Sequence, residues 1–202
     1  MATIPYPLIV IALFNSSVST VTVSFTGELT WVTDSEGQLD PSIAVGTPFS
    51  GSFTFDPSLA VDSDPSELHG VYEFDSSMQV NIGSSHFESP NLTVTASLTG
   101  GTIGGQGYGA YGQQFVSEGI LFDYMTFSLW TYADDVLDDD SLFESLDLAD
   151  FPDIQAFRLW ADDINLYGQL NSVVIPEPSG LFVLLTGVLL ATSRTHSRKA
   201  MR

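Results

Sequence analysis

The feature that most constrains the fold is an alternation of apolar and polar residues that recurs along the middle of the chain. Between Val21 and Trp31, large apolar residues alternate with Thr, Ser and Glu. In a later run, Phe49, Phe53 and Phe55 fall on one face. Side chains of a β-strand point alternately to opposite faces, and β-branched and aromatic residues are common in strands. The pattern therefore predicts strands with one buried face.

Similar runs follow at short, regular intervals, and they predict six more strands: Val71–Phe74, Met78–Ile82, Asn91–Leu98, Gly119–Tyr132, Ile154–Trp160 and Ile164–Leu170. Many short strands at such spacing favour an all-β fold, and we expect an antiparallel β-sandwich, jelly-roll-like or Ig-like, of roughly seven to ten strands. The uncharged, glycine-rich segment Gly100–Gly112 lacks the Lys-Ser/Thr and the helix of a phosphate-binding loop. We expect this segment to be a flexible loop or an irregular edge segment.

The last thirty residues, 173–202, differ in composition from the rest and are interpreted as a membrane-targeting signal. They contain the sorting-motif candidates Pro176, Glu177 and Pro178, and then an apolar segment that we expect to form a hydrophobic helix: Gly180, Leu181, Phe182, Val183, Leu184, Leu185, Val188, Leu189, Leu190 and Ala191. A basic cluster ends the chain, with Arg194, Arg198, Lys199 and Arg202. These four are all but one of the Lys and Arg residues in the protein. Positive flanks hold the cytoplasmic end of a membrane segment.

Two interpretations of this tail remain open. The apolar stretch is shorter than the roughly 20 residues of a spanning helix, so a buried C-terminal helix of a globular domain is the alternative. A buried helix gives no reason for the basic residues to gather at the end of the chain. We therefore expect a signal that inserts transiently into the inner membrane.

The order of Pro176-Glu177-Pro178, apolar segment and basic cluster resembles the PEP-CTERM sorting signal of Gram-negative bacteria that make extracellular polymer. The resemblance covers residues 174–202 and implies that exosortase, a membrane-embedded protease-transpeptidase, recognises the tripeptide and removes the tail. Phe25-Thr-Gly27 and residues 45–57 also resemble the N-terminal half of uncharacterised PEP-CTERM proteins. That second resemblance implies a β-rich exported domain and no known activity.

The first residues, 1–19, are predicted to be a signal peptide that forms an N-terminal signal helix. Leu8–Phe14 is apolar, and small residues at Ser17 and Ser19 suit signal peptidase, so we expect cleavage after Ser19. No Lys or Arg precedes the apolar run, which suits a weak signal or a true start upstream. The alternative is a buried first strand.

The remaining body, residues 20–172, is long enough for one domain with a core and is strongly acidic. It holds 24 of the 25 acidic residues but one basic residue, Arg158, for a formal charge of −23 with His neutral. Such a charge repels nucleic acid and anionic lipid and attracts cations and basic partners. Solubility, or adaptation to salt in an extracellular setting, is the favoured explanation of the charge. The chain has no cysteine, which excludes thiol catalysis, thiolate zinc sites and iron–sulfur clusters.

The densest group of carboxylates is the calcium-site candidate of the sequence: Asp134, Asp135, Asp138, Asp139 and Asp140. Calcium prefers six to eight oxygen ligands, and carboxylates on an extracellular loop supply them. The EF-hand spacing is absent, and a solvated acidic loop is the alternative. Calcium is the one cofactor that the pattern suggests.

Enzyme motifs are absent from the chain: there is no Gly-x-Ser-x-Gly and no His-Glu-x-x-His. We therefore expect no catalytic residues and an exported surface or matrix protein with a structural or adhesive role. Exposed aromatics such as Tyr108, Tyr111 or Trp160 would bind extracellular polysaccharide. A secreted glycan hydrolase with a carboxylate pair is the alternative, because the spacing of such a pair is not visible in sequence.

Overall fold

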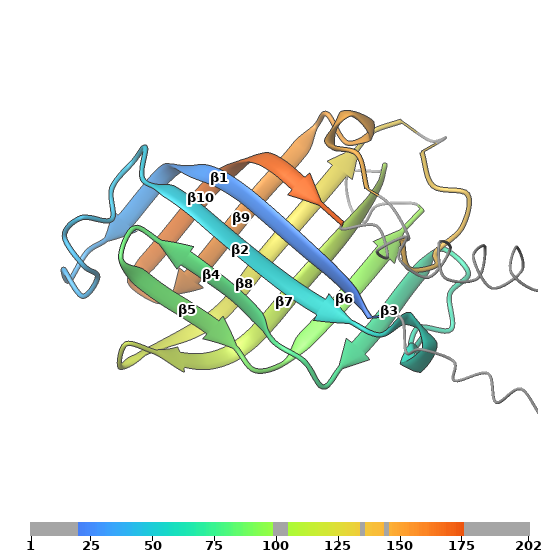
Figure 1. Ribbon diagram of the computed structural model, residues 1–202, viewed down its shortest axis with the longest axis horizontal. Helices are drawn as coiled ribbons and strands as arrows, with labels where there is room; N and C mark the ends of the chain where they lie inside the picture. The colour runs from blue at the N-terminus through green and yellow to red at the C-terminus, as the bar shows by residue number, and fades with distance from the viewer. Residues whose placement is uncertain (1–19, 99–104, 134–135, 144–145, 176–202) are drawn as a thin grey trace, which may run out of the picture.

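A computed structural model describes residues 20–98, 105–133, 136–143 and 146–175 (Figure 1). The described chain forms ten strands: β1 (Val21–Asp34), β2 (Pro48–Phe55), β3 (His69–Phe74), β4 (Met78–Ile82), β5 (Ser85–Ser89), β6 (Leu92–Ser97), β7 (Gln106–Ser117), β8 (Ile120–Thr131), β9 (Ile154–Ala161) and β10 (Ile164–Val174). Two short 3-10 turns, η1 (Pro57–Leu59) and η3 (Leu148–Asp150), lie between strands. The expected all-β antiparallel fold is confirmed.

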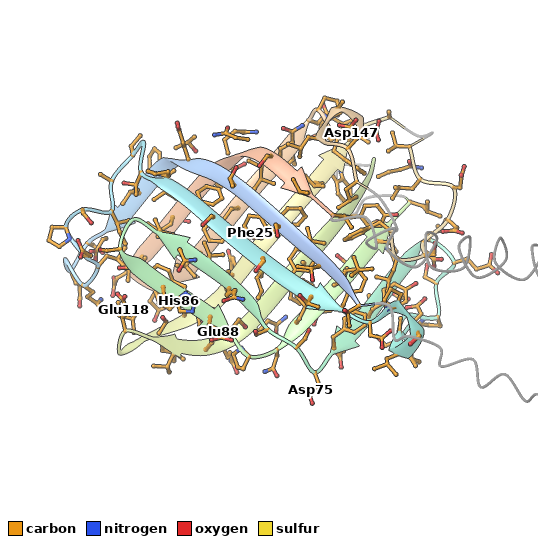
Figure 2. The ribbon with its side chains drawn as sticks, in the orientation of Figure 1. Phe25, Asp75, His86, Glu88, Glu118 and Asp147 are labelled. Carbon is orange, nitrogen blue, oxygen red and sulfur yellow. The ribbon has the colours of Figure 1, made fainter. Side chains whose placement is uncertain are left out.

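All ten strands belong to one sheet, in the order β3-β6-β7-β8-β9-β10-β1-β2-β4-β5. The sheet curls until β1, β2, β4 and β5 lie across β7, β8 and β9, as Figure 1 shows. Rings from the two halves meet inside: the centroids of Phe25 and Phe127 are 5.1 Å apart, and those of Phe87 and Phe122 are 5.5 Å apart. Figure 2 shows Phe25 in this interior.

The prediction of two separate stacked sheets is corrected to one continuous, curled sheet. The pairing of β1 with β10 shifts register at two points, between Thr26 and Gly27 and between Leu29 and Trp31. In β7, Gln114 has a φ of 45°. Bulges increase the local right-handed twist, and a strongly twisted sheet of many strands curls instead of staying open. One sheet therefore covers both sides of the core.

The segment expected to be a loop, Gly100–Gly112, is corrected from Gln106 onward, where β7 pairs with β6 and β8 inside the sheet. Its glycines reflect close packing. A Cβ at Gly107 would lie 2.3 Å from the Leu129 carbonyl oxygen, and one at Gly112 would lie 1.9 Å from Ser89 Oγ. The second contact brings the β5 edge onto β7, so glycine permits the sheet to curl this far.

The two ends of the described chain leave from the same end of the sheet. Val174, the last residue of β10, pairs with Ser24 near the start of β1, and Val173 and Ile175 pack against the core. The last strand thus extends two residues past the predicted end of the body at 172. The expected signal helix and C-terminal hydrophobic helix lie outside the described residues. Within the described ranges, no helix has the length and hydropathy to cross a membrane.

Candidate functional site

Two rows of side chains run across the outer face of β7, β8, β9, β10 and β1. Register pairs each residue with the next, so the first row is Tyr111, Thr126, Arg158, Tyr167 and Trp31. The second row is Gln113, Tyr124, Trp160, Asn165 and Thr33. We call these ten residues the outer aromatic face, because five of them are Tyr or Trp.

Strand periodicity places these rings outside. Their neighbours Phe127, Leu129, Leu159 and Leu166 are fully buried on the inner face, so the alternate residues point outward. Trp31 is an exception to its own pattern, because simple alternation would put it inside with Leu29. The bulge between the two reverses the side, so Leu29 is 1% exposed and Trp31 is 60% exposed.

Arg158 organises the centre of the outer aromatic face. Its guanidinium carbon lies 4.1 Å from the ring centroid of Trp160 and 5.4 Å from that of Tyr124, and Arg158 Nε donates to Asn165 Oδ1 at 3.1 Å. Burial raises the pKa of Tyr124, and the Arg158 charge opposes that rise. These contacts hold the cation and the rings in one arrangement, and they also stabilise the outer side of the sheet.

The outer aromatic face carries no carboxylate, although the body contains 24. Among the described residues the one ion pair joins His86 Nε2 to Glu88 Oε2, 3.9 Å apart, so Arg158 is in none. Trp31 Nε1 donates to Thr33 Oγ1 at 2.9 Å, which fixes its indole, and Tyr167 beside it is 38% exposed. The ten residues therefore offer positioned aromatic surface that contains no carboxylate of its own, although the charge of the neighbouring Asp123 helps to raise the pKa of Tyr124.

The predicted polysaccharide-binding aromatics separate in the structure. Tyr111 and Trp160 lie on the outer aromatic face. The prediction that Tyr108 is exposed is wrong, because this residue is 8% exposed. Its ring centroid lies 4.8 Å from that of Phe143, and its hydroxyl donates to the Ser141 carbonyl at 3.4 Å. Burial raises the pKa of Tyr108 to about 12. Trp31, Tyr124 and Tyr167 were missed as members of a site, because the alignment of the two rows depends on strand order.

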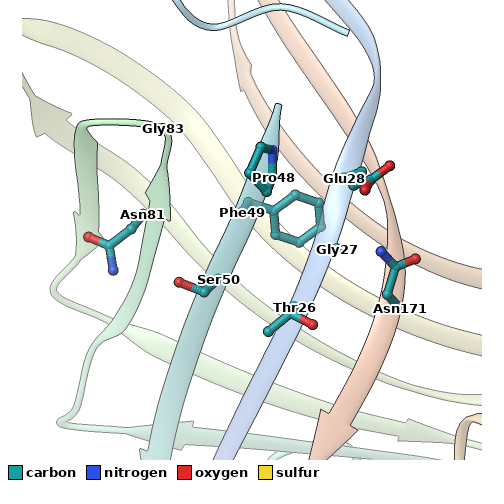
Figure 3. A pocket seen from close by; sticks show the side chains of 9 residues that line it. All are labelled: Thr26, Gly27, Glu28, Pro48, Phe49, Ser50, Asn81, Gly83 and Asn171. Atoms are coloured by element: carbon teal, nitrogen blue, oxygen red, sulfur yellow. The ribbon is translucent and has the colours of Figure 1, made fainter. Parts of the chain in front are cut away.

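A depression with a mixed polar and apolar lining lies beside this face, over β1, β2, β4 and β10 (Figure 3). We call it the polar depression after the hydroxyl, amide and carboxylate groups that it presents. It encloses about 430 Å³ and is lined by Thr26, Gly27, Glu28, Pro48, Phe49, Ser50, Asn81, Gly83 and Asn171. Asn171 is the extra residue of the bulge where β10 shifts against Thr26 and Gly27. Bulges re-aim side chains in this way. The Phe49 ring lies beneath β1, where a Cβ on Gly27 would be 2.4 Å from it.

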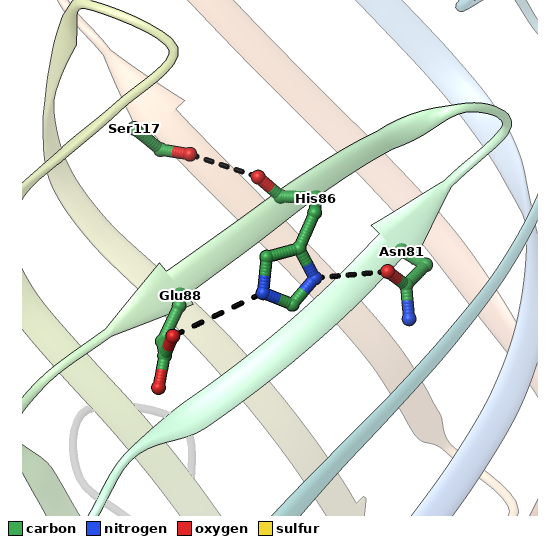
Figure 4. Close-up of polar contacts among 4 residues, drawn as sticks. All are labelled: Asn81, His86, Glu88 and Ser117. Atoms are coloured by element: carbon green, nitrogen blue, oxygen red, sulfur yellow. Dashed lines mark hydrogen bonds and ion pairs between the residues drawn. The ribbon is translucent and has the colours of Figure 1, made fainter.

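His86 lies near this depression but has no nucleophile beside its ring (Figure 4). Its Nδ1 is 2.9 Å from Asn81 Oδ1, and its Nε2 faces Glu88. Ser117 Oγ donates to the main-chain carbonyl of His86 at 2.9 Å, and not to the imidazole. The group therefore joins β4, β5 and the end of β7, and it does not form a Ser–His catalytic pair.

Two of the three described members of the calcium candidate, Asp139 and Asp140, accept hydrogen bonds within the domain. Asp139 Oδ1 accepts from the Ser141 amide at 2.9 Å and from its hydroxyl, and these hydrogen bonds lower the pKa of Asp139. The Asp140 carbonyl accepts from Tyr72 Oη at 3.0 Å. Within the described ranges no three His, Asp or Glu side chains are placed to hold a metal ion. Asp134 and Asp135 lie outside those ranges.

Among the described residues, two carboxylates have a displaced pKa, and in both it is lowered. Hydrogen bonds from Ser42 lower the pKa of Asp40, and Asp139 is lowered similarly. A general acid for glycoside hydrolysis needs a raised pKa. The sorting motif (176–178), the apolar segment (180–191) and the basic cluster (194–202) lie outside the described residues.

Comparisons with protein-family models, with curated proteins and with solved structures found no match to this chain.

Proposed function

We propose that this protein is an exported surface or matrix protein that binds extracellular polysaccharide through its outer aromatic face, without catalysing a reaction. One observation carries the proposal: five aromatic side chains share two registered rows that contain no carboxylate, on an otherwise acidic domain. The apolar C–H faces of sugar rings stack on Tyr and Trp rings, while amides such as Asn165 and Gln113 bond the hydroxyls.

Delivery rests on the tail. Its motif, apolar segment and basic cluster support sorting by exosortase after signal peptidase has removed residues 1–19, with transient insertion in the inner membrane. Processing is tested by mass spectrometry of the exported protein's C-terminus. A chain that still ends at Arg202 outside the cell contradicts removal of the tail.

Binding is tested with full-length protein in mild detergent, sedimented with insoluble cellulose, chitin and β-1,3-glucan. We expect retention on at least one polymer and its loss in a Trp31→Ala, Trp160→Ala double variant. Tyr132→Ala is the matched control, because Tyr132 is 53% exposed but lies outside the two rows. Equal retention of the double variant contradicts the proposal. Reducing ends that accumulate during incubation favour the hydrolase.

A further inference from the structure

The outer aromatic face and the polar depression share two strands, β1 and β10, and lie on the same side of them. Moving along β1 from Trp31, which pairs with Tyr167, the chain reaches Glu28, which pairs with Gln169 and lines the depression. Trp31 and Glu28 are three positions apart along the strand, a distance of about 10 Å. A single extended ligand can therefore contact both.

The depression differs from the aromatic rows in its chemistry. It presents the hydroxyls of Thr26 and Ser50, the amides of Asn81 and Asn171, and the Glu28 carboxylate. Thr26 Oγ1 is held by Ser172 Oγ at 2.7 Å, and Asn81 Oδ1 is held by His86. In the part of the chain that the structure describes, the side chains of Ser50 and Asn171 make no hydrogen bond. Donors and acceptors are thus oriented, and some are free.

We infer that the depression is a second subsite for the same polysaccharide, and that its ligand is a neutral, hydroxyl-rich sugar. This inference rests on the proposed function. Hydroxyl groups match the hydroxyl and amide set of the depression, and Glu28 accepts from a sugar hydroxyl but repels a uronate or sulfate. The charge of the body repels anionic polymers further. The aromatic rows supply stacking, while the depression fixes the position and direction of the chain.

The test is calorimetry on full-length protein with cello- and β-1,3-gluco-oligosaccharides of increasing length. We expect affinity to rise until the oligosaccharide bridges both regions. A Ser50→Ala, Asn171→Ala variant should lose about tenfold in affinity for long oligosaccharides, as expected for two hydrogen bonds, and nothing for short ones. Ser52→Ala is the matched control, since Ser52 lies on β2 but does not line the depression.

The outcomes separate the two proposals. If the double variant binds long oligosaccharides as tightly as wild type while Trp31→Ala weakens them, the subsite inference is wrong and the proposed function stands. If alginate oligosaccharides bind more tightly than neutral ones, the neutral class is wrong. Absence of binding by wild-type protein to any polysaccharide in either assay overturns both.

Discussion

The inner and outer faces of β8 and β9 carry aromatic pairs that differ in what surrounds them. Phe127 opposes Phe157 on the inner face, and Tyr124 opposes Trp160 three residues away on the outer face. The inner rings contact other rings, including Phe25 at 5.1 and 6.4 Å, and are fully buried. The outer rings contact Arg158 and remain half-buried. Aromatic content alone thus does not distinguish the core from the proposed binding surface. The groups that each ring contacts distinguish them: other rings inside, and the Arg158 guanidinium outside.

Replacing one ring of each pair by alanine should give the largest difference between the inner and outer faces. Phe157→Ala removes a buried ring and should lower the free energy of unfolding by about 3–5 kcal/mol. Trp160→Ala should cost much less stability while reducing polysaccharide retention. Urea unfolding followed by circular dichroism measures both. Similar stability losses in the two variants would mean that Trp160 is mainly structural.

Two glycines of β7, Gly107 and Gly109, extend the comparison of buried and outer positions from side chains to the packing of the backbone. Gly107→Ala would place a Cβ 2.3 Å from the Leu129 carbonyl, and overpacking of this kind should cost about 1–3 kcal/mol. Gly109→Ala is the control, because its close neighbour at 2.8 Å is the Thr95 hydroxyl and the nearest backbone atom is 3.8 Å away. Thermal melts of the two variants should therefore differ, with Gly107→Ala the less stable.

Arg158 tests the organisation of the outer rings. Arg158→Ala removes two cation–π contacts and should lower stability by about 1 kcal/mol, with a larger relative loss of polysaccharide retention. Arg158→Lys keeps the charge but not the planar stacking or the bond from Nε to Asn165, so only part of the retention should return. Full rescue by Lys would show that charge alone matters.

The effect of Tyr108 is absent at neutral pH and appears only at alkaline pH. Because burial raises the pKa of Tyr108 from 10.0 to about 12, the native state holds this proton more tightly than the unfolded chain. Its stabilisation is complete below pH 10 and is lost as pH rises toward 12. Urea midpoints between pH 8 and 11.5 should fall more for wild type than for Tyr108→Phe. Tyr72, whose pKa burial also raises, contributes to the remaining slope.

Part of the fold could be predicted from the local alternation of apolar and polar residues. Phe49, Phe53 and Phe55 are buried on one face as their spacing predicts, and Ile164 and Leu166 lie opposite Tyr167. The candidate site was accessible only in fragments. Trp160 and Tyr111 were singled out, but Tyr108 was placed outside because its partners, Phe143 and Ser141, lie more than thirty residues away.

The sequence by itself determined eight of the ten strands, with β5 and β7 missed, together with their buried faces and the acidic character of the body, because these follow from period two and from composition. It also predicts the sorting tail. The tertiary structure decided that one sheet encloses the core, that glycine-rich β7 lies inside that sheet, and that a bulge turns Trp31 outward. Those features depend on pairing between distant strands and on close backbone contacts, which no local pattern encodes. The alignment of five rings in two rows is a consequence of that pairing.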